Sequence, residues 1–163
     1  MAQYCLYLPA ESAILSDLNH ILGYLKKQHV LSLCGRSEDD LWCANCFYVF
    51  NQQQMAFWIM SETHTRHGEL LVADPRVAGT VNGQTRTVML IKGVQYRGRA
   101  SLLQGAQESE ARAAYCRRFP VARSASAPLW AISLDELKMT DNTLGFGKKM
   151  IWRREAGPAE PAC

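Results

Sequence analysis

Hydroxyl and basic side chains crowd one short segment, 61–67, and phosphate binding is the chemistry that they could perform. Thr63 and Thr65 stand just before Arg66 and His67, and an apolar run that favours a short helix follows directly. A helix N-terminus carries about half a positive charge, so cations there reduce stability unless an anion compensates them. Backbone N–H groups, hydroxyls and a guanidinium at one helix end suit a phosphate. The alternative is that Thr65 only caps the helix while Arg66 faces solvent.

The cysteines are the second group that could do chemistry, as metal ligands or redox thiols. Cys43 and Cys46 have the C-x-x-C spacing, but they lie in segment 41–50, which has strand composition. Side chains three apart in a strand point to opposite faces, so the two thiolates cannot share one metal. No second C-x-x-C or close Cys/His pair completes a site. We therefore predict free thiols and no metal, with the terminal Cys5 and Cys163 incidental.

A third candidate is the run 145–149, in which two glycines stand beside two lysines. It lacks the strand, the spacing and the hydroxyl of a nucleotide-binding P-loop. Lys148 and Lys149 could contact a phosphate from a mobile loop, or both are solvated charges. The chain has no Gly-x-Ser-x-Gly elbow, no supported Ser/His/Asp order and no dinucleotide-binding glycine fingerprint, so no protein nucleophile is indicated.

Composition limits the classes of function. With 163 residues, 48% of them hydrophobic and 20% charged, the chain suits one globular domain. The net charge of +3 comes from scattered residues, so we expect no nucleic-acid partner. The longest apolar stretches, 42–50 and 55–60, fall far short of the roughly 20 residues of a membrane helix, so we expect no membrane partner. Residues 1–9 lack a secretion-signal pattern, which makes the cytoplasm the expected compartment.

The elements that must position these residues can be predicted from periodicity and turn residues. Apolar spacing predicts helices at about 11–27, 68–73 and 107–118. Strand composition predicts strands at 29–34, 41–50, 55–60, 76–81, 87–103, 129–134 and 137–140. Asn82-Gly83 predicts a tight hairpin, Gly93 a bulge or bend in the long strand, and Asp135-Glu136 a break between the last two strands.

These elements predict a mainly β (α+β) fold, a six- to seven-stranded antiparallel split β-barrel of Greek-key type with flanking helices. Closure of the barrel removes exposed strand edges. We expect a single domain over 1–156 and a disordered tail over 157–163, which is rich in proline and alanine.

Several segments resemble a known superfamily. Segments 61–67, 74–79 and 118–120 resemble the pyridoxamine phosphate oxidase-like split barrels. Within that superfamily, Leu41-Trp42-Cys43-Ala44-Asn45, Val81-Asn82-Gly83-Gln84 and the stretch 140–152 resemble the YhbP family. The resemblance covers roughly residues 20–152, and the stretch 140–152 is its most specific part.

The resemblance implies a homodimer with two FMN molecules in clefts between the subunits. In such proteins the basic and hydroxyl residues after the third strand hold the flavin phosphate, which maps onto Thr63, Thr65 and Arg66, with His67 as a weaker member. Family members commonly have lysine where Arg66 stands. The isoalloxazine would lie near Trp42, Asn45 and Ser61. Lys148 or Lys149 would face the cleft of the partner subunit, unless both are solvated charges.

The resemblance further implies an FMN-dependent oxidoreductase or flavin reductase that acts on a small-molecule substrate, with reduced nicotinamide as a possible electron donor. The alternative is a non-catalytic binding or sensor module that holds FMN, heme or another phosphate-bearing ligand, with His64 or His67 implicated if heme binds. A third reading is an interaction protein with an empty cleft.

Overall fold

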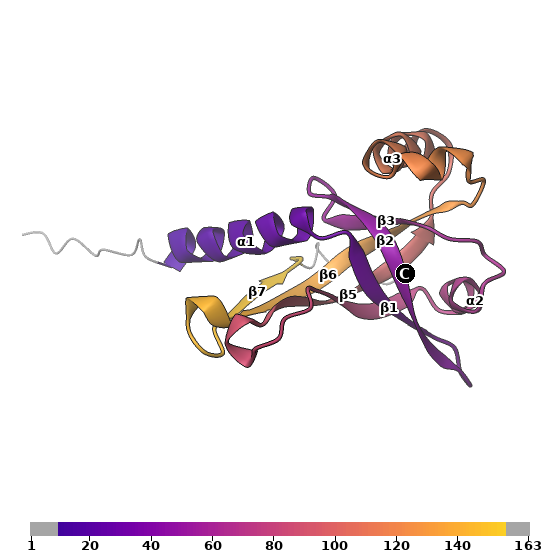
Figure 1. Ribbon diagram of the computed structural model, residues 1–163. Helices are drawn as coiled ribbons and strands as arrows, with labels where there is room; N and C mark the ends of the chain where they lie inside the picture. The colour runs from indigo at the N-terminus through magenta and orange to yellow at the C-terminus, as the bar shows by residue number, and fades with distance from the viewer. Residues whose placement is uncertain (1–9, 156–163) are drawn as a thin grey trace, which may run out of the picture.

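Seven antiparallel strands form one sheet that closes into a barrel (Figure 1). The structure is a computed structural model and describes residues 10–155. The strand order is β3-β2-β1-β4-β5-β6-β7, and β3 also pairs with β6, so six strands close the barrel and β7 lies outside it. This confirms the predicted antiparallel split barrel. The strands are β1 (Val30–Arg36), β2 (Leu41–Asn51), β3 (Ala56–Met60), β4 (Arg76–Asn82), β5 (Lys92–Leu102), β6 (Leu129–Asp141) and β7 (Lys149–Arg153).

Strand β6 runs without a break through the residues predicted to separate two strands. Arg97 of β5 pairs with Glu136 and Gly98 pairs with Leu134, so Asp135 is the extra residue of a β-bulge. The bulge therefore lies opposite Arg97 and Gly98 and not at the predicted Gly93. The extra residue lets β6 bend and change its second neighbour from β3 to β7. Strand β7 was not predicted.

The predicted tight hairpin at Asn82-Gly83 is also wrong. A longer connection joins β4 to β5 and contains a 3₁₀ helix, η1 (Val88–Leu90). Asn142, in η3 (Asn142–Leu144), donates its side-chain amide to the Val88 carbonyl at 2.7 Å and its backbone N–H to the Ile91 carbonyl at 3.0 Å. These tertiary bonds hold the connection open, and no local sequence signal reveals them.

Three helices cover parts of the barrel (Figure 1): α1 (Ala10–Lys27), α2 (Arg66–Ala73) and α3 (Gly105–Arg118). Helix α1 packs its second half on the core, so Ile21 and Leu25 are fully buried, whereas the apolar Ile14 and Leu15 of its first half are exposed. Helix α2 lies beside β1 and β2. A short 3₁₀ helix, η2 (Pro120–Ser124), follows α3.

Strand β3 is buried on both faces because two layers cover it. Phe57 and Ile59 point into the barrel core, where Tyr48 and Tyr96 meet the Phe57 ring edge-on. Trp58 points outward and packs under α3 in a second cluster. The strand therefore reads as a continuous apolar run instead of an alternating one.

No helix within residues 10–155 is long and apolar enough to cross a membrane. The expected tail, 157–163, and the terminal Cys5 and Cys163 lie outside the described residues.

Candidate functional site

The N-terminus of α2 is built by the segment that the sequence singled out. Thr65 caps the helix: its hydroxyl accepts a hydrogen bond from the Gly68 N–H at 3.1 Å and donates to the Glu62 carbonyl at 2.8 Å. A Cβ at position 68 would collide with the Glu62 carbonyl, so only glycine permits this tight wrap. The amides of Arg66 and His67 open the helix and have no carbonyl within it to bond.

Three side chains meet at this helix end. His67 Nε2 lies 2.6 Å from Ser61 Oγ and 3.3 Å from Thr65 Oγ1. Ser61 is buried, and its carbonyl accepts the Trp130 indole N–H at 3.0 Å. Burial lowers the pKa of His67, which favours the neutral ring. Within residues 10–155 no carboxylate hydrogen-bonds His67, so the pair lacks the third member of a Ser–His–acid triad.

Arg66 reaches instead to the tip of the β1–β2 hairpin. Its Nε and Nη2 donate to the two carboxylate oxygens of Asp40 at 2.9 and 2.7 Å, and its guanidinium lies 3.9 Å from the centroid of the Trp42 ring. The hydrogen bonds from Arg66 lower the pKa of Asp40. Asp40 and the stack on Trp42 were not foreseen, because nothing in the spacing links a turn residue to a helix start 26 positions away.

The remaining predicted site residues lie in other places. Thr63 is half-buried in the turn before α2. Asn45 Oδ1 accepts a hydrogen bond of 3.0 Å from the Ser32 hydroxyl. Asn45 lies on the exposed outer face of β2, and Trp42 lies on the opposite face. Lys148 Nζ lies 3.8 Å from Asp17 of α1, and Lys149 is exposed in β7.

The two lysines and Arg66 occupy opposite ends of the barrel. Lys149 pairs with Thr140, near the end where Lys92 pairs with Asp141. Helix α2 lies at the other end (Figure 1), and Arg66, its first residue, bonds Asp40 in the β1–β2 turn. One copy of the chain therefore brings together Ser61, Thr65 and His67, and also Trp42 and Arg66, but it does not bring the lysines to them.

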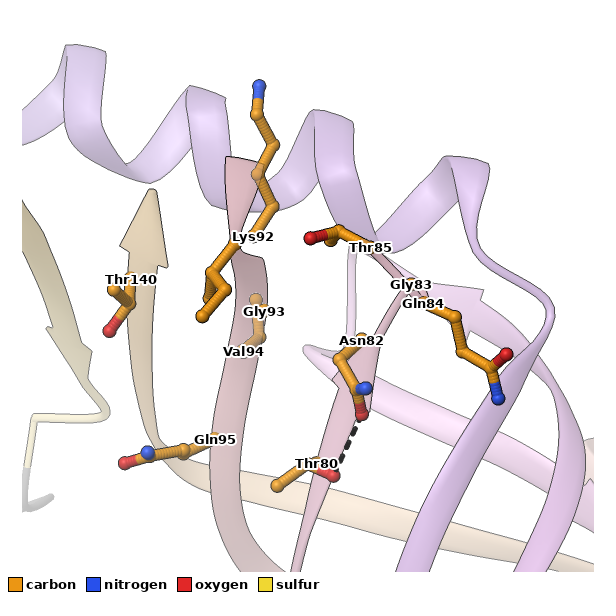
Figure 2. A pocket seen from close by; sticks show the side chains of 11 residues that line it. Thr80, Asn82, Gly83, Gln84, Thr85, Lys92, Gly93, Val94, Gln95 and Thr140 are labelled. Carbon is orange, nitrogen blue, oxygen red and sulfur yellow. Dashed lines mark hydrogen bonds between the residues drawn. The ribbon is translucent and has the colours of Figure 1, made fainter. Parts of the chain in front are cut away.

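One groove of the described structure lies on the outer face, away from Arg66. It encloses about 590 Å³ between β4, β5 and the connection that joins them (Figure 2). Thr80, Asn82 and Gln95 supply hydroxyl and amide groups, and the Thr80 hydroxyl donates to Asn82 Oδ1 at 3.3 Å. Sequence reasoning missed this groove. The available signal was the alternation of β4 and β5, which places these polar residues on one face.

Lys92 borders the groove but its charge is used elsewhere. Figure 2 shows its side chain extending away from Thr80 and Gln95, and its Nζ lies 3.2 Å from the fully buried Asp141. His20 Nε2 also contacts Asp141, at 2.8 Å, and Thr143 donates two hydrogen bonds to it. Burial alone would raise the pKa of Asp141, but the hydrogen bonds from Thr143, His20 and Lys92 outweigh it and lower the pKa to about 2.

Within residues 10–155 no group of three or more His, Cys, Asp or Glu side chains could hold a metal ion. The start of α2 offers open backbone amides, an imidazole and a guanidinium, which are groups that bind anions.

Comparisons with solved structures show the fold. A heme-binding protein from Mycobacterium smegmatis superposes with a TM-score of 0.68 at 17% identity, over 86% of this chain and 57% of that one. A candidate pyridoxamine 5′-phosphate oxidase from Listeria innocua gives 0.61 at 15% identity, over 74% and 95% of the two chains. An FAD-binding protein from Mesorhizobium loti gives 0.58 at 17% identity, over 73% and 90%.

Comparisons of sequence show the family. No protein-family model matches the chain. A UPF0306 protein of Yersinia pseudotuberculosis is 60% identical over 138 residues, which are 85% of this chain and 94% of the relative. A UPF0306 protein of Photorhabdus laumondii is 56% identical over 131 residues, which are 80% and 92% of the two chains. The chain belongs to the UPF0306 family.

Proposed function

We propose that this chain binds FMN as a homodimeric cytoplasmic flavoprotein of the YhbP type and acts as an oxidoreductase or flavin reductase on a small molecule. One observation carries the proposal: hydroxyl, imidazole, guanidinium and free amide groups converge where α2 begins. Similar folds in an FAD-binding protein and a candidate pyridoxamine 5′-phosphate oxidase support it.

The residues present fit the phosphate end of the cofactor. The open amides of Arg66 and His67 and the hydroxyl of Thr63 are donors for a phosphate, whereas the Thr65 hydroxyl is engaged in the helix cap. Arg66 uses Nε and Nη2 on Asp40, which leaves Nη1 for a second anion. Asp40 weakens this attraction, because its carboxylate neutralises the guanidinium.

A second copy of the chain would complete the site. A groove of about 590 Å³ is within the usual range for small-molecule sites, roughly 300–1,000 Å³, but it lies far from the α2 N-terminus of the same copy. The groove adjoins the outer face of β4 and β5, which continues across β1 and β2 to the exposed apolar side chains Phe47 and Val30. The α2 N-terminus lies at the end of β2, where Arg66 stacks on Trp42. We propose that a two-fold pair formed through the outer face sets the groove of one copy against the α2 N-terminus of its partner. That arrangement would also admit Lys148 or Lys149 of one copy to the partner's site.

The cofactor supplies the electron transfer when bound, and the chain's own residues bind and orient it. Thr65 fixes the helix start, and His67 holds Ser61 in place. Asn45 and Ser32 offer an amide and a hydroxyl on the outer face, where the edge of a flavin ring could hydrogen-bond.

The visible spectrum of the purified protein and a titration with FMN test the proposal. We expect a flavin spectrum and saturable binding. Arg66→Ala should weaken binding by about tenfold to a hundredfold, as expected when a charge-assisted hydrogen bond is lost. The matched control is Arg123→Ala, at an exposed position in η2, which should leave affinity unchanged. Absence of binding, or equal affinity in both variants, would contradict the phosphate placement.

Catalysis is tested separately from binding. Addition of NADH or NADPH to the FMN-loaded protein under anaerobic conditions should bleach the flavin absorption if the protein is a reductase. A bound flavin that keeps its colour with both donors would identify a passive holder of FMN.

Heme is the second candidate ligand. The observation that favours it is the exposed imidazole of His64 beside the candidate site. His67 Nε2 is engaged by Ser61, whereas the exposed His64 has no hydrogen bond among the described residues. An exposed imidazole of this kind can bind heme iron. A Soret band after addition of hemin that is lost in His64→Ala, with no FMN binding, would replace FMN by heme.

Light scattering tests the dimer. Ala78 is exposed at the centre of the outer face, so Ala78→Arg should convert a dimer into a monomer. Val121→Arg, at an exposed apolar residue in η2, is the control and should leave the mass unchanged. A wild-type protein that is monomeric at all concentrations would remove the proposed shared site.

A further inference from the structure

Two cysteines meet across β1 and β2, where sequence spacing does not reveal them. Cys34 pairs directly with Cys43, and both thiols are free. Cys43 is exposed on the outer face, whereas Cys46, its partner in the C-x-x-C spacing, is buried in the barrel. The opposite faces of Cys43 and Cys46 agree with the sequence prediction. The thiol that faces Cys43 is therefore that of Cys34.

The ladder places this pair at a position that suits a disulfide. Near one end of the ladder the Ser37 N–H donates to the Asp40 carbonyl at 2.8 Å, and near the other the Tyr48 N–H donates to the His29 carbonyl at 2.9 Å. Hydrogen-bonded and non-hydrogen-bonded pairs alternate along an antiparallel ladder. The Ser37 and Asp40 pair and the His29 and Tyr48 pair are hydrogen-bonded, and the Cys34 and Cys43 pair lies an odd number of residues from each. It is therefore a non-hydrogen-bonded pair, whose Cα atoms lie about 4.5 Å apart. Disulfides span Cα separations of about 4.4 to 6.8 Å.

The two thiols differ in access, which assigns them different roles. Cys43 is exposed, whereas Cys34 is half-buried and lines a shallow groove of about 250 Å³. The residue that pairs with Cys34 on β4 is the small Ala78, which leaves the groove open. Burial of Cys34, reinforced by the neighbouring Cys43 thiol, raises the pKa of Cys34 to about 11. Cys43 is thus the thiol that meets a reagent first, and Cys34 is the one that follows.

We propose that Cys34 and Cys43 form a redox-active dithiol, which a small-molecule disulfide of the glutathione class converts into a cross-strand disulfide. The Cys43 thiolate attacks one sulfur of the small disulfide, forms a mixed disulfide and releases one small thiolate. The Cys34 thiolate then attacks the Cys43 sulfur and releases the second. The protein loses two electrons and two protons, and the small disulfide takes them up as two thiols.

The dithiol is coupled to the candidate site by position. In the ladder it lies between the Gly35 and Trp42 pair and the Leu33 and Ala44 pair, so a covalent bond there fixes the stretch of β2 that presents Trp42 to Arg66. Exposed disulfides of this kind are readily reduced, which suits a reversible modification. The proposal needs only these two thiols and does not rest on FMN binding. Both thiols lie on the outer face that we propose for dimer formation, so the small disulfide meets them in the monomer.

Tryptic peptide mapping tests the proposal, because trypsin cleaves after Arg36, between the two cysteines. The reduced full-length protein is incubated with oxidised glutathione, free thiols are blocked with iodoacetamide, and the digest is analysed by mass spectrometry. We expect peptides 28–36 and 37–66 joined, with the loss of two hydrogen atoms, and separated again by dithiothreitol. Absence of the joined peptides after prolonged oxidation would overturn the proposal.

Peptide 37–66 contains both Cys43 and Cys46, so variants are needed to assign the bond. Cys43→Ser should abolish the joined peptides. It also removes the possibility of a disulfide within peptide 37–66, which then contains only Cys46. Cys116→Ser, at a half-buried thiol on α3, is the matched control and should retain them. Joined peptides that persist in Cys43→Ser would place the bond at Cys46 and overturn the proposal. An unchanged melting temperature of reduced Cys43→Ser would show that the variant remains folded.

Discussion

Asp40 holds the guanidinium of Arg66 through two hydrogen bonds, of 2.9 and 2.7 Å. The bond ties the turn between β1 and β2 to the first residue of α2. It also places a carboxylate beside the cation that we assign to the flavin phosphate. Two anions then compete for one guanidinium, so Asp40 limits the affinity of the proposed site.

Removal of Asp40 should therefore strengthen the binding of FMN. We expect Asp40→Ala to raise affinity by about threefold, the scale of an exposed charge interaction, as measured by fluorescence titration at low salt. Asp39→Ala, at an exposed residue next to it, is the control and should have little effect. Weaker binding in Asp40→Ala would mean that Asp40 positions Arg66 for the ligand and does not compete with it.

Acidification should destabilise the protein through His67. Its folded-state pKa lies below the value of about 6.5 for an unfolded chain, so the unfolded state takes up the proton first. The contribution of the neutral His67 to stability is therefore fully present above about pH 6.5 and is lost as the pH falls below that value. We expect the melting temperature of the wild type to fall by a few degrees more than that of His67→Gln between pH 7 and pH 5. His64→Gln should follow the wild type, and an equal fall in all three proteins would exclude His67 as the cause.

Asp141 should control stability in a more acidic window. Its pKa of about 2 in the fold lies below the unfolded value of about 3.9, so its contribution is present above pH 4 and is lost as the pH falls toward 2. The difference corresponds to about 3 kcal/mol at neutral pH. Asp141→Asn should lower the free energy of unfolding at pH 7 by about that amount and flatten its dependence on pH below 4. Urea denaturation at several pH values measures both effects.

Gly79 should tolerate no side chain. The Tyr96 hydroxyl passes it to reach the Ser32 carbonyl at 2.9 Å, and a Cβ at position 79 would collide with both groups. Gly79→Ala must push β4 away from β1, so we expect a loss of at least about 2 kcal/mol of stability by urea denaturation. Gly83→Ala is the control, because nothing lies within 4 Å of a Cβ there. Equal stability of the two variants would show that the strands separate without cost.

The barrel was predictable because its signals are local. Apolar runs and polar turns located the first three strands and all three helices to within a few residues. The failures arise where distant contacts override local chemistry. Asn142 bonds the connection that follows Asn82-Gly83 and prevents a tight hairpin there. Asp135 is the extra residue of a bulge, so β6 continues through Asp135-Glu136 where a break was predicted.

The candidate site was predictable in its residues but not in its partners. The positions of Ser61, Thr65 and His67 in one segment made their meeting a local matter. The pairing of Arg66 with Asp40, and that of Cys34 with Cys43, depends on strand register and helix placement. Spacing along the chain reports neither.

The place of β7 outside the closed barrel bears on how the protein behaves at high concentration. Among residues 10–155, β7 is the strand whose far side pairs with no other strand in the sheet order. Such a side can recruit strands from other molecules and start fibrils. It is five residues long and carries Lys149 and Arg153 at its two ends. A short edge strand with a cation at each end repels the β7 strand of another copy, which protects the fold from polymerising edge to edge.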